Sequence, residues 1–410
     1  MFMENKKTAD SVFDIVIIGG GPSGAVCAIR LKQLNPSLKV CIVDRNPFPR
    51  DKACGDGLGP GVHKIINDLG LITMLNKRES IERLIVASPD GYELNAELPT
   101  MGDIKPLGFV IPRLAFDNEL IEAVRRLGVI LFEGFEISGF KDNGIFETEV
   151  FIKKQTTATI LTTKLLIGAD GARSKLRRLL NIPYNSDKHT GIAIRCYCEL
   201  EGYTEMSLRL DFLKEINPGY GWVFPVNKTY ANIGVGIDVS KLKKRQLSLD
   251  DMFEAYLKYL SNKINIKVHT ETKLNYILPY GSQMPALVNT NNKVLIGDAA
   301  SMINPFTGEG IFYGMYAGKS LAENIYNKLG DEKMLSSSLQ SFEIDFKKKF
   351  KKHFKINNTA KYLMNSKFVN FAIRASRKDP EVLQQGIELM MGDRRSFTLK
   401  HLFKILLKGL

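Results

Sequence analysis

The start of the chain alternates between short apolar runs and a helical pattern. Apolar runs at 14–18 and 39–43 predict two strands, and residues 22–34 between them repeat apolar positions at helical spacing. Helical patterns return at about 61–70 and 113–127. Because a strand–helix–strand unit is the element of parallel sheets, the chain is predicted to open with a Rossmann-like domain.

Farther along, the apolar positions recur with a period of two. Residues 83–98 alternate around an Asp-Gly turn and predict a hairpin, and 129–168 read as several strands. Alternation over 191–236 predicts an antiparallel sheet separate from the first layer. A long helix is expected at 310–329 and a strongly basic helical segment at 339–370. The predicted fold class is therefore α/β, with a Rossmann-like domain, an antiparallel-sheet substrate domain and a C-terminal helical segment.

A glycine motif follows the first predicted strand. Gly19-x-Gly21-x-x-Gly24 opens the helix, and Asp44 ends the next strand, 20 residues after Gly24. Here Gly19 permits a tight turn, Gly21 lets the backbone approach a pyrophosphate and Gly24 lets the helix pack closely. Free N–H groups at the helix start favour phosphates, and Asp44 is expected to accept hydrogen bonds from an adenosine ribose. The pattern predicts a dinucleotide site, and ordinary glycine-rich turns are the alternative.

Two further aspartates end short apolar strands and indicate which dinucleotide is bound. Asp170 follows KLLIGA, and Asp298 follows KVLIG. An NAD dehydrogenase has no use for strand-end aspartates so far downstream, whereas FAD is long and crosses several strand ends. The sequence therefore predicts FAD.

These ordered motifs resemble those of the aromatic-hydroxylase-like superfamily of FAD enzymes. Residues 47–60 (PFPRDKACGDGLGP), 218–236 (PGYGWVFPVNKTYANIGVG) and 304–314 (NPFTGEGIFYG) are similar to the geranylgeranyl reductase family, which saturates isoprenoid double bonds with reduced FAD. The resemblance covers about 12–330. The FAD-binding residues that it implies are Gly19, Gly21, Pro22, Ser23, Gly24, Asp44, Arg45, Cys54, Gly55, Asp56, Arg113, Asp170, Gly297, Asp298, Pro305, Gly308, Gly310 and Ile311.

The resemblance also implies a substrate site, and the order of elements along the chain predicts domain boundaries. Substrate contacts are expected from Tyr220, Trp222, Phe224 and Pro225, and catalytic roles from Cys54, Tyr220 and Trp222. The predicted regions are a discontinuous FAD-binding domain (1-75, 108-185 and 275-335), a substrate-binding sheet domain (76-107 and 186-274) and a basic C-terminal helical region (336-410).

Saturating an isolated alkene requires a hydride on one carbon and a proton on the other, in a dry and shaped pocket. Tyr220, Trp222 and Phe224 alternate along a predicted strand, so their rings share one face and can tolerate developing positive charge. A buried aromatic core strip is the alternative. Cys54, in a glycine-rich loop, is a candidate proton source or substrate gate, and equally a structural cysteine.

Three basic residues are candidates for phosphate contacts. The superfamily resemblance places Arg113 on the cofactor's phosphate or ribityl region, whereas a surface pair with Asp117, one turn along the helix, is the alternative. Arg50 and Lys52, beside the cysteine loop, are candidates to hold a phosphate of the substrate or of a nicotinamide donor. The alternative is that Arg50 and Lys52 are solvated charges of a surface loop and bind no phosphate.

Positive charge is concentrated at the C-terminal end. Residues 341–410 hold 12 Lys and 4 Arg against 6 Asp and Glu, most of the net charge of +13. Residues 346–355 (FKKKFKKHFK) carry six lysines, and 396–410 form an amphipathic pattern with lysines along one face. Such helices suit an anionic membrane surface. A helix docked on the protein's own core is the alternative, and no recognition module supports nucleic acid.

The remaining sequence features indicate the cellular compartment in which the protein is expected. Five cysteines in a long chain predict neither a disulfide framework nor a zinc site, and no metal is expected. Neither a signal peptide nor a run of about 18–20 apolar residues is visible. We therefore expect a cytoplasmic enzyme, peripheral on the inner face of the membrane if the basic helices bind lipid.

Two functions share the three flavin motifs. The first is an FAD-dependent reductase of a geranylgeranyl or polyprenyl chain, such as an isoprenoid lipid or a prenyl quinone. The alternative is an FAD monooxygenase of a hydrophobic or aromatic small molecule. The CGDG loop and the 220–225 stretch favour the reductase, and the single tryptophan excludes the paired-Trp motif of flavin halogenases. No second dinucleotide fold is visible, so NAD(P)H or a ferredoxin-type donor is expected to reduce the flavin.

Overall fold

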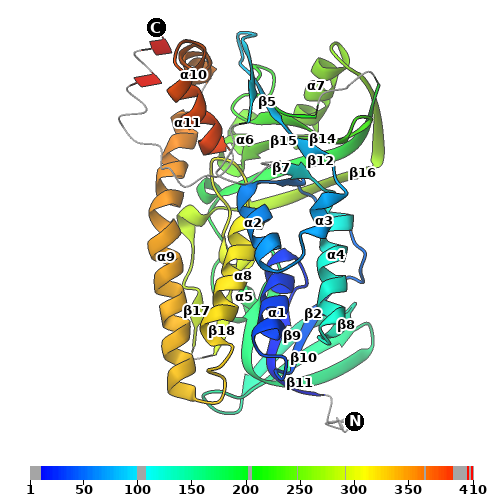
Figure 1. The fold of residues 1–410 in the computed structure, drawn as a ribbon, viewed down its shortest axis with the longest axis vertical. Helices are drawn as coiled ribbons and strands as arrows, with labels where there is room; N and C mark the ends of the chain where they lie inside the picture. The colour runs from blue at the N-terminus through cyan, green and yellow to red at the C-terminus, as the bar shows by residue number, and fades with distance from the viewer. Residues whose placement is uncertain are drawn as a thin grey trace.

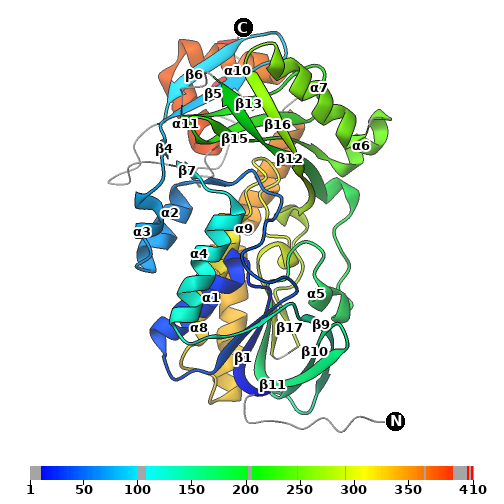
Figure 2. The same ribbon diagram turned by 90° about the vertical axis from the view of Figure 1, so that its right-hand side faces the viewer.

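The computed structural model describes residues 11–98, 108–201, 206–246, 248–290, 292–363, 366–390, 404–405 and 408–409. Two large sheets lie toward opposite ends of the molecule, as Figures 1 and 2 show. The long helix α9 (Glu332–Leu363) runs along one side, from the first sheet toward the second.

The first sheet has eight strands with a parallel centre. Its strands are β1 (Val12–Ile18), β2 (Val40–Asp44), β8 (Ile130–Glu133), β9 (Glu136–Asp142), β10 (Thr148–Lys154), β11 (Thr157–Gly168), β17 (Val288–Asn289) and β18 (Lys293–Leu295). β18, β11, β1, β2 and β8 run parallel in that order, and β10 and β9 extend β11 as antiparallel strands. Continuous apolar strands such as β1 fit a sheet that is covered on both faces. The predicted Rossmann-like layer is confirmed.

Helices pack closely on this layer. α1 (Pro22–Leu34) begins with proline. Proline is tolerated at this position because a backbone N–H there would have no hydrogen-bond partner within the helix. α8 (Ile311–Ile325) approaches α1 through glycines, because a Cβ at Gly314 or Gly318 would lie 2.2–2.3 Å from Ser23. The other helices of this part are α2 (Pro60–Asp68), α3 (Thr73–Asn76), α4 (Arg113–Arg126) and α5 (Lys175–Leu179). A small sheet joins β3 (Gly57–Leu58), β7 (Gly108–Val110) and β4 (Ser80–Ile81).

The second sheet has seven strands in the order β16-β12-β15-β14-β13-β5-β6. They are β5 (Arg83–Ala87), β6 (Glu93–Glu97), β12 (Thr190–Glu201), β13 (Ser207–Asp211), β14 (Tyr220–Asn227), β15 (Tyr230–Asp238) and β16 (Asn265–Pro279). The predicted hairpin is confirmed as β5 and β6, and neighbouring strands are antiparallel except for β13 and β5. α7 (Leu249–Ser261) buries Met252, Phe253 and Tyr256 in the core of this sheet, and α6 (Val239–Arg245) precedes it.

α9 joins the two sheets. It carries four buried phenylalanines at intervals of four residues, Phe342, Phe346, Phe350 and Phe354. The Phe350 ring lies 5.2 Å and 5.1 Å, between centroids, from Tyr313 and Tyr316 of α8. Near the other end of α9, Lys361 donates a hydrogen bond to Asp238 of β15 at 2.9 Å. Lysines of the 346–355 run face solvent, among them Lys348 and Lys352.

The helices after α9 pack against the second sheet. α10 (Ser366–Lys378) buries Val369 and Ile373 against Leu84 and Val86, and α11 (Pro380–Met390) follows. The predicted amphipathic segment 396–410 lies largely outside the described residues. Within its described part, Ile405 is buried with Ala375 and Val382, and Lys404 pairs with Asp379 at 3.1 Å and Glu381 at 2.6 Å. These contacts favour the alternative in which this part of the segment packs on the protein itself. No helix within the described ranges has the length and apolar character to cross a membrane.

Candidate active site

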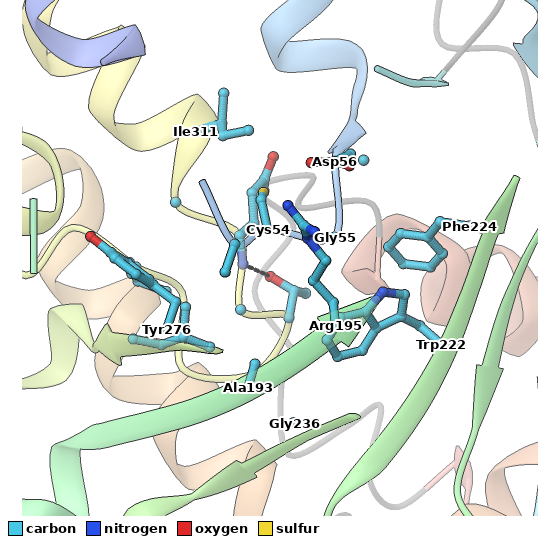
Figure 3. A pocket seen from close by; sticks show the side chains of 18 of the residues that line it. Cys54, Gly55, Asp56, Ala193, Arg195, Trp222, Phe224, Gly236, Tyr276 and Ile311 are labelled. Carbon is cyan, nitrogen blue, oxygen red and sulfur yellow. Dashed lines mark hydrogen bonds between the residues drawn. The ribbon is translucent and has the colours of Figure 1, made fainter. Parts of the chain in front are cut away.

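One cavity connects the glycine motif of the first sheet with β14 of the second. Its open space measures about 2270 Å³, including the solvent at its mouth. Loops 52–59 and 305–311 line it together with strands of the second sheet, and Figure 3 shows part of this lining. Residues from far apart in the chain therefore share one space.

The glycine motif forms the cavity's end at the first sheet. Gly19 has a φ of 106°, and a Cβ there would lie 2.3 Å from a backbone carbonyl oxygen. A Cβ on Gly24 would lie 2.0 Å from the carbonyl oxygen of Gly19. The Cβ position of Gly21, by contrast, has only the Arg50 and Arg113 guanidinium groups nearby, at 3.8 Å and 4.0 Å. Gly21 thus leaves open the place where a pyrophosphate would approach.

Asp44 ties the end of β2 to this loop. Its carboxylate accepts hydrogen bonds from the backbone N–H of Gly20 at 2.8 Å and of Asn46 at 3.0 Å. Arg50 donates to the same carboxylate at 3.2 Å. Arg45, the next residue, is exposed and does not line the cavity.

Arg113 and Asp117 form a buried ion pair beside Gly21. Two guanidinium nitrogens of Arg113 donate to the two carboxylate oxygens at 2.6 Å and 2.7 Å, and Arg50 donates to Asp117 at 3.0 Å. Arg113 is 3% exposed and Asp117 fully buried. The alternative interpretation was an Arg113–Asp117 pair at the protein surface. The pair is present, but both side chains are buried, so its predicted surface location is wrong. Arg50 also pairs with Asp44, so two guanidinium groups face two carboxylates here, and both guanidinium groups lie beside the Cβ position of Gly21.

Lys52 spans the cavity to Asp298. Its ammonium group donates to the carboxylate at 3.0 Å and lies 4.4 Å from the centre of the Tyr276 ring, whose hydroxyl also donates to Asp298 at 3.1 Å. Burial opposes ionisation, yet the Lys52 charge holds the pKa of Asp298 below its usual value. Asp298, a predicted FAD contact, is therefore paired with Lys52, which was a candidate for a phosphate of the substrate or of a nicotinamide donor.

The aromatic side chains of β14 form one wall. The rings of Tyr220 and Trp222 lie 6.1 Å apart, and those of Trp222 and Phe224 lie 6.2 Å apart, and all three line the cavity. The predicted common face is confirmed. Pro225, one residue farther along this extended strand, lies on the opposite face and does not line the cavity, so its expected substrate contact stays a prediction.

Below this wall, the Cys54–Gly57 loop is held by a polar network. Asn232 of β15 accepts from the Trp222 indole at 2.9 Å and donates to the Cys54 carbonyl at 2.7 Å. It also donates to Asp56 at 2.7 Å, and the Tyr197 hydroxyl donates to the same oxygen at 2.6 Å. Burial raises the pKa of Asp56 to about 7 and also raises the pKa of the Cys54 thiol.

Sequence reasoning missed several residues of this site. Glu309 lines the cavity, and burial raises its pKa to about 8. Its place between two glycines of the GEG loop was the available signal. Arg195 of β12 is 1% exposed and pairs with Asp51 at 2.6 Å, and Tyr197 lies two residues further on the same strand. No sequence motif indicates a role for Asp51, Arg195 or Tyr197.

Most predicted site residues line the cavity. Those that do are Gly21, Pro22, Ser23, Cys54, Gly55, Asp56, Arg113, Tyr220, Trp222, Phe224, Asp298, Pro305, Gly308, Gly310 and Ile311. Those that do not are Gly19, Gly24, Asp44, Arg45, Asp170, Pro225 and Gly297. The carboxylate of Asp170 accepts hydrogen bonds from Ser174, Lys175 and Leu176 at the start of α5, and its expected contact with FAD stays a prediction.

The cavity fits FAD. The first turn of α1, with Gly21 as its N-cap, has no side-chain cap, which leaves its N–H groups for a phosphate. Gly21 leaves the approach open, and the guanidinium group of Arg113, which is paired with Asp117, lies 4.0 Å from its Cβ position. Within the described ranges no cluster of metal-ligating side chains is present. The fold and cavity define an FAD-dependent oxidoreductase.

Comparisons with known proteins agree with this class. Residues 12–337 match the FAD binding domain family, to which the chain therefore belongs. It is 29% identical over 316 residues to menaquinone reductase from Mycolicibacterium smegmatis, covering 76% of this chain and 75% of that protein. It is 28% identical to digeranylgeranylglycerophospholipid reductase from Methanosphaerula palustris, covering 76% and 75%. A geranylgeranyl bacteriochlorophyll reductase-like protein from Thermoplasma acidophilum has the same fold (TM-score 0.80, 18% identity, 96% and 99% covered).

Proposed function

We propose that this protein is an FAD-dependent reductase that saturates carbon–carbon double bonds of an isoprenoid chain. The observation that carries the proposal is the aromatic wall of Tyr220, Trp222 and Phe224 in the cavity. Trp222 and Phe224 lie against the Cys54–Gly57 loop (Figure 3), and Tyr220 lies beside Gly308. Such a wall suits an apolar chain, and its ring faces tolerate positive charge on a protonated alkene. The names of the relatives support a prenyl quinone or an isoprenoid lipid as substrate.

Each group of residues has a proposed task. The glycine motif and Arg113 hold the pyrophosphate of FAD, while Lys52 and Asp298 position its ribityl region. Reduced FAD supplies the hydride. The β14 aromatics bind and orient the alkene and exclude water, which strengthens every electrostatic interaction inside the cavity. Cys54 shapes the wall opposite them, and NAD(P)H or a ferredoxin-type protein regenerates the reduced flavin.

The test is anaerobic reoxidation of the dithionite-reduced holoenzyme. Menaquinone and digeranylgeranylglycerophospholipid are the probes, because the two relatives are named for them. We expect one probe to restore oxidised flavin absorbance without oxygen and to gain two hydrogen atoms per flavin in its isoprenoid chain. Fragmentation in the mass spectrometer locates the added hydrogens, because reduction of a quinone ring adds the same mass. Flavin that stays reduced until air enters, followed by an oxygenated product, would replace the reductase by the monooxygenase alternative.

We also propose that the exposed lysines of α9 contact an anionic membrane surface, where such a substrate resides. Each lysine near the surface contributes about 1 kcal/mol. The double change Lys348→Glu and Lys352→Glu is expected to weaken co-sedimentation with phosphatidylglycerol vesicles at least tenfold. The same changes at Lys39 and Lys228, exposed elsewhere, serve as the control. Equal loss in both variants, or equal binding to neutral phosphatidylcholine vesicles, would contradict a lipid contact through α9.

A further inference from the structure

A carboxyl group in the cavity wall has one oxygen without a partner. Asp56 is fully buried, and its Oδ2 accepts both hydrogen bonds, from Tyr197 and from Asn232. Oδ1 is itself buried and has no hydrogen-bond partner among the described residues. An ionised carboxylate in this position is costly, whereas the neutral acid can carry its proton on the unpartnered oxygen.

The backbone holds this carboxyl in place. Asp56 has a φ of 63°, a left-handed conformation that is unfavourable for most residues and that concentrates at functional sites. Ile111 donates its N–H to the Asp56 carbonyl at 3.1 Å. The glycines on either side pack on Phe224, because a Cβ at Gly55 or Gly57 would lie 3.2 Å or 3.5 Å from that ring. The loop is therefore fixed against the wall that faces the proposed alkene.

Asn232 connects the acid with that wall. Its side-chain oxygen accepts from Trp222, so its amide nitrogen must face Asp56 and the Cys54 carbonyl. Tyr197, the second donor, is itself covered by the Arg195 guanidinium, 4.4 Å from the ring centre. Both donors stabilise a carboxylate that has released its proton.

We propose that Asp56 is the general acid of this site and that Tyr197 and Asn232 are positioning residues. The inference rests on the proposed reductase function. The π bond of the alkene is lost as one carbon gains the hydride that reduced FAD supplies and the other gains the Asp56 proton. The carboxylate that remains is stabilised by its two donors and regains a proton from solvent.

The charges around Asp56 suit this role. Burial raises its pKa to about 7, against the lowering effects of the Tyr197 hydrogen bond and of Arg195 and Arg113. A general acid works best when its pKa lies near the working pH. The thiol of Cys54, the nearest alternative donor in the same loop, has a pKa that burial raises above its usual value, so it is the weaker acid.

The first experiment measures single-turnover reoxidation of the reduced holoenzyme by menaquinone or digeranylgeranylglycerophospholipid across pH 5–9. The wild-type rate should fall as pH rises through about 7, where Asp56 loses its proton. Asp56→Asn keeps the shape but cannot supply the proton, so the rate should drop at least about 100-fold without that pH dependence. Tyr197→Phe removes a hydrogen bond that stabilises the Asp56 carboxylate, so the pKa of Asp56 should rise. The rate of this variant should therefore fall at a higher pH than the wild-type rate. Asp187→Asn, at an exposed site, should match the wild type.

A second measurement does not depend on turnover. Infrared difference spectra, wild type minus Asp56→Asn, should contain a carboxylic-acid carbonyl band at pH 5–6 that is lost as the pH rises through about 7. The acid band of Glu309, whose pKa is raised to about 8, is common to both proteins and cancels. Absence of that difference band at pH 5–6, or an Asp56→Asn rate within threefold of the wild type, would overturn the assignment. Flavin that neither probe reoxidises in the wild type would instead overturn the reductase function, whatever the infrared result.

Discussion

Gly21→Ala is expected to weaken FAD binding by at least about tenfold, or 1.4 kcal/mol, while the apoprotein stays as stable as the wild type. The added methyl group meets only two guanidinium groups, at 3.8 Å and 4.0 Å, so the protein itself accommodates it. It occupies the space through which the backbone approaches the pyrophosphate. Isothermal titration calorimetry of FAD with the apoprotein measures the affinity, and thermal unfolding measures the stability.

Gly24→Ala is the matched comparison within the same motif. Its Cβ would lie 2.0 Å from the carbonyl oxygen of Gly19, so α1 must shift and the apoprotein itself should lose stability. A Gly21→Ala protein that binds FAD with wild-type affinity would contradict the proposed place of the pyrophosphate. Equal destabilisation of both apoproteins would show that Gly21 serves the fold alone.

Asp117→Ala is expected to lower the free energy of unfolding by about 3–5 kcal/mol, because it leaves a buried Arg113 without its counter-ion. Arg113 is 3% exposed, and Arg50 loses the same partner. The loss should also enlarge the positive charge beside Gly21. Urea denaturation of the apoprotein, followed by circular dichroism, measures the change.

Glu122→Ala on the same helix separates burial from charge. Glu122 pairs with Arg125 on the exposed side of α4, where both side chains remain more than a third exposed. Surface pairs contribute little, so this variant should stay within about 0.5 kcal/mol of the wild type. If Asp117→Ala changed stability no more than Glu122→Ala, the buried pair would not contribute to the fold as we infer.

The sequence predicted those parts of the fold and cavity that local patterns encode. The strand–helix–strand start, the β5–β6 hairpin and the common face of Tyr220, Trp222 and Phe224 all depend on residues within a few positions of one another. The motifs also predicted FAD. The last residue of the same family pattern, Pro225, lies on the other face of the strand, so its expected substrate contact stays a prediction.

The rest depended on contacts between distant segments. Asp56 meets Tyr197 and Asn232, which lie 141 and 176 positions away, and Lys52 meets Asp298 across 246 positions. A single sequence contains no spacing that joins such pairs. The burial that raises the pKa of Asp56 and of Glu309 is likewise a property of the assembled cavity. Charged residues in the loops could therefore be named, but their ionisation and partners required the fold.

The position of Trp222 gives this protein a built-in optical probe. It is the chain's single tryptophan, and its indole lies in the cavity wall, 5% exposed and hydrogen-bonded to Asn232. Ultraviolet-excited emission near the red end of the protein spectrum therefore originates from this one place. Entry of an apolar ligand into the cavity can be followed as quenching or a wavelength shift of this emission, without a label and without turnover, even in variants that have lost their activity.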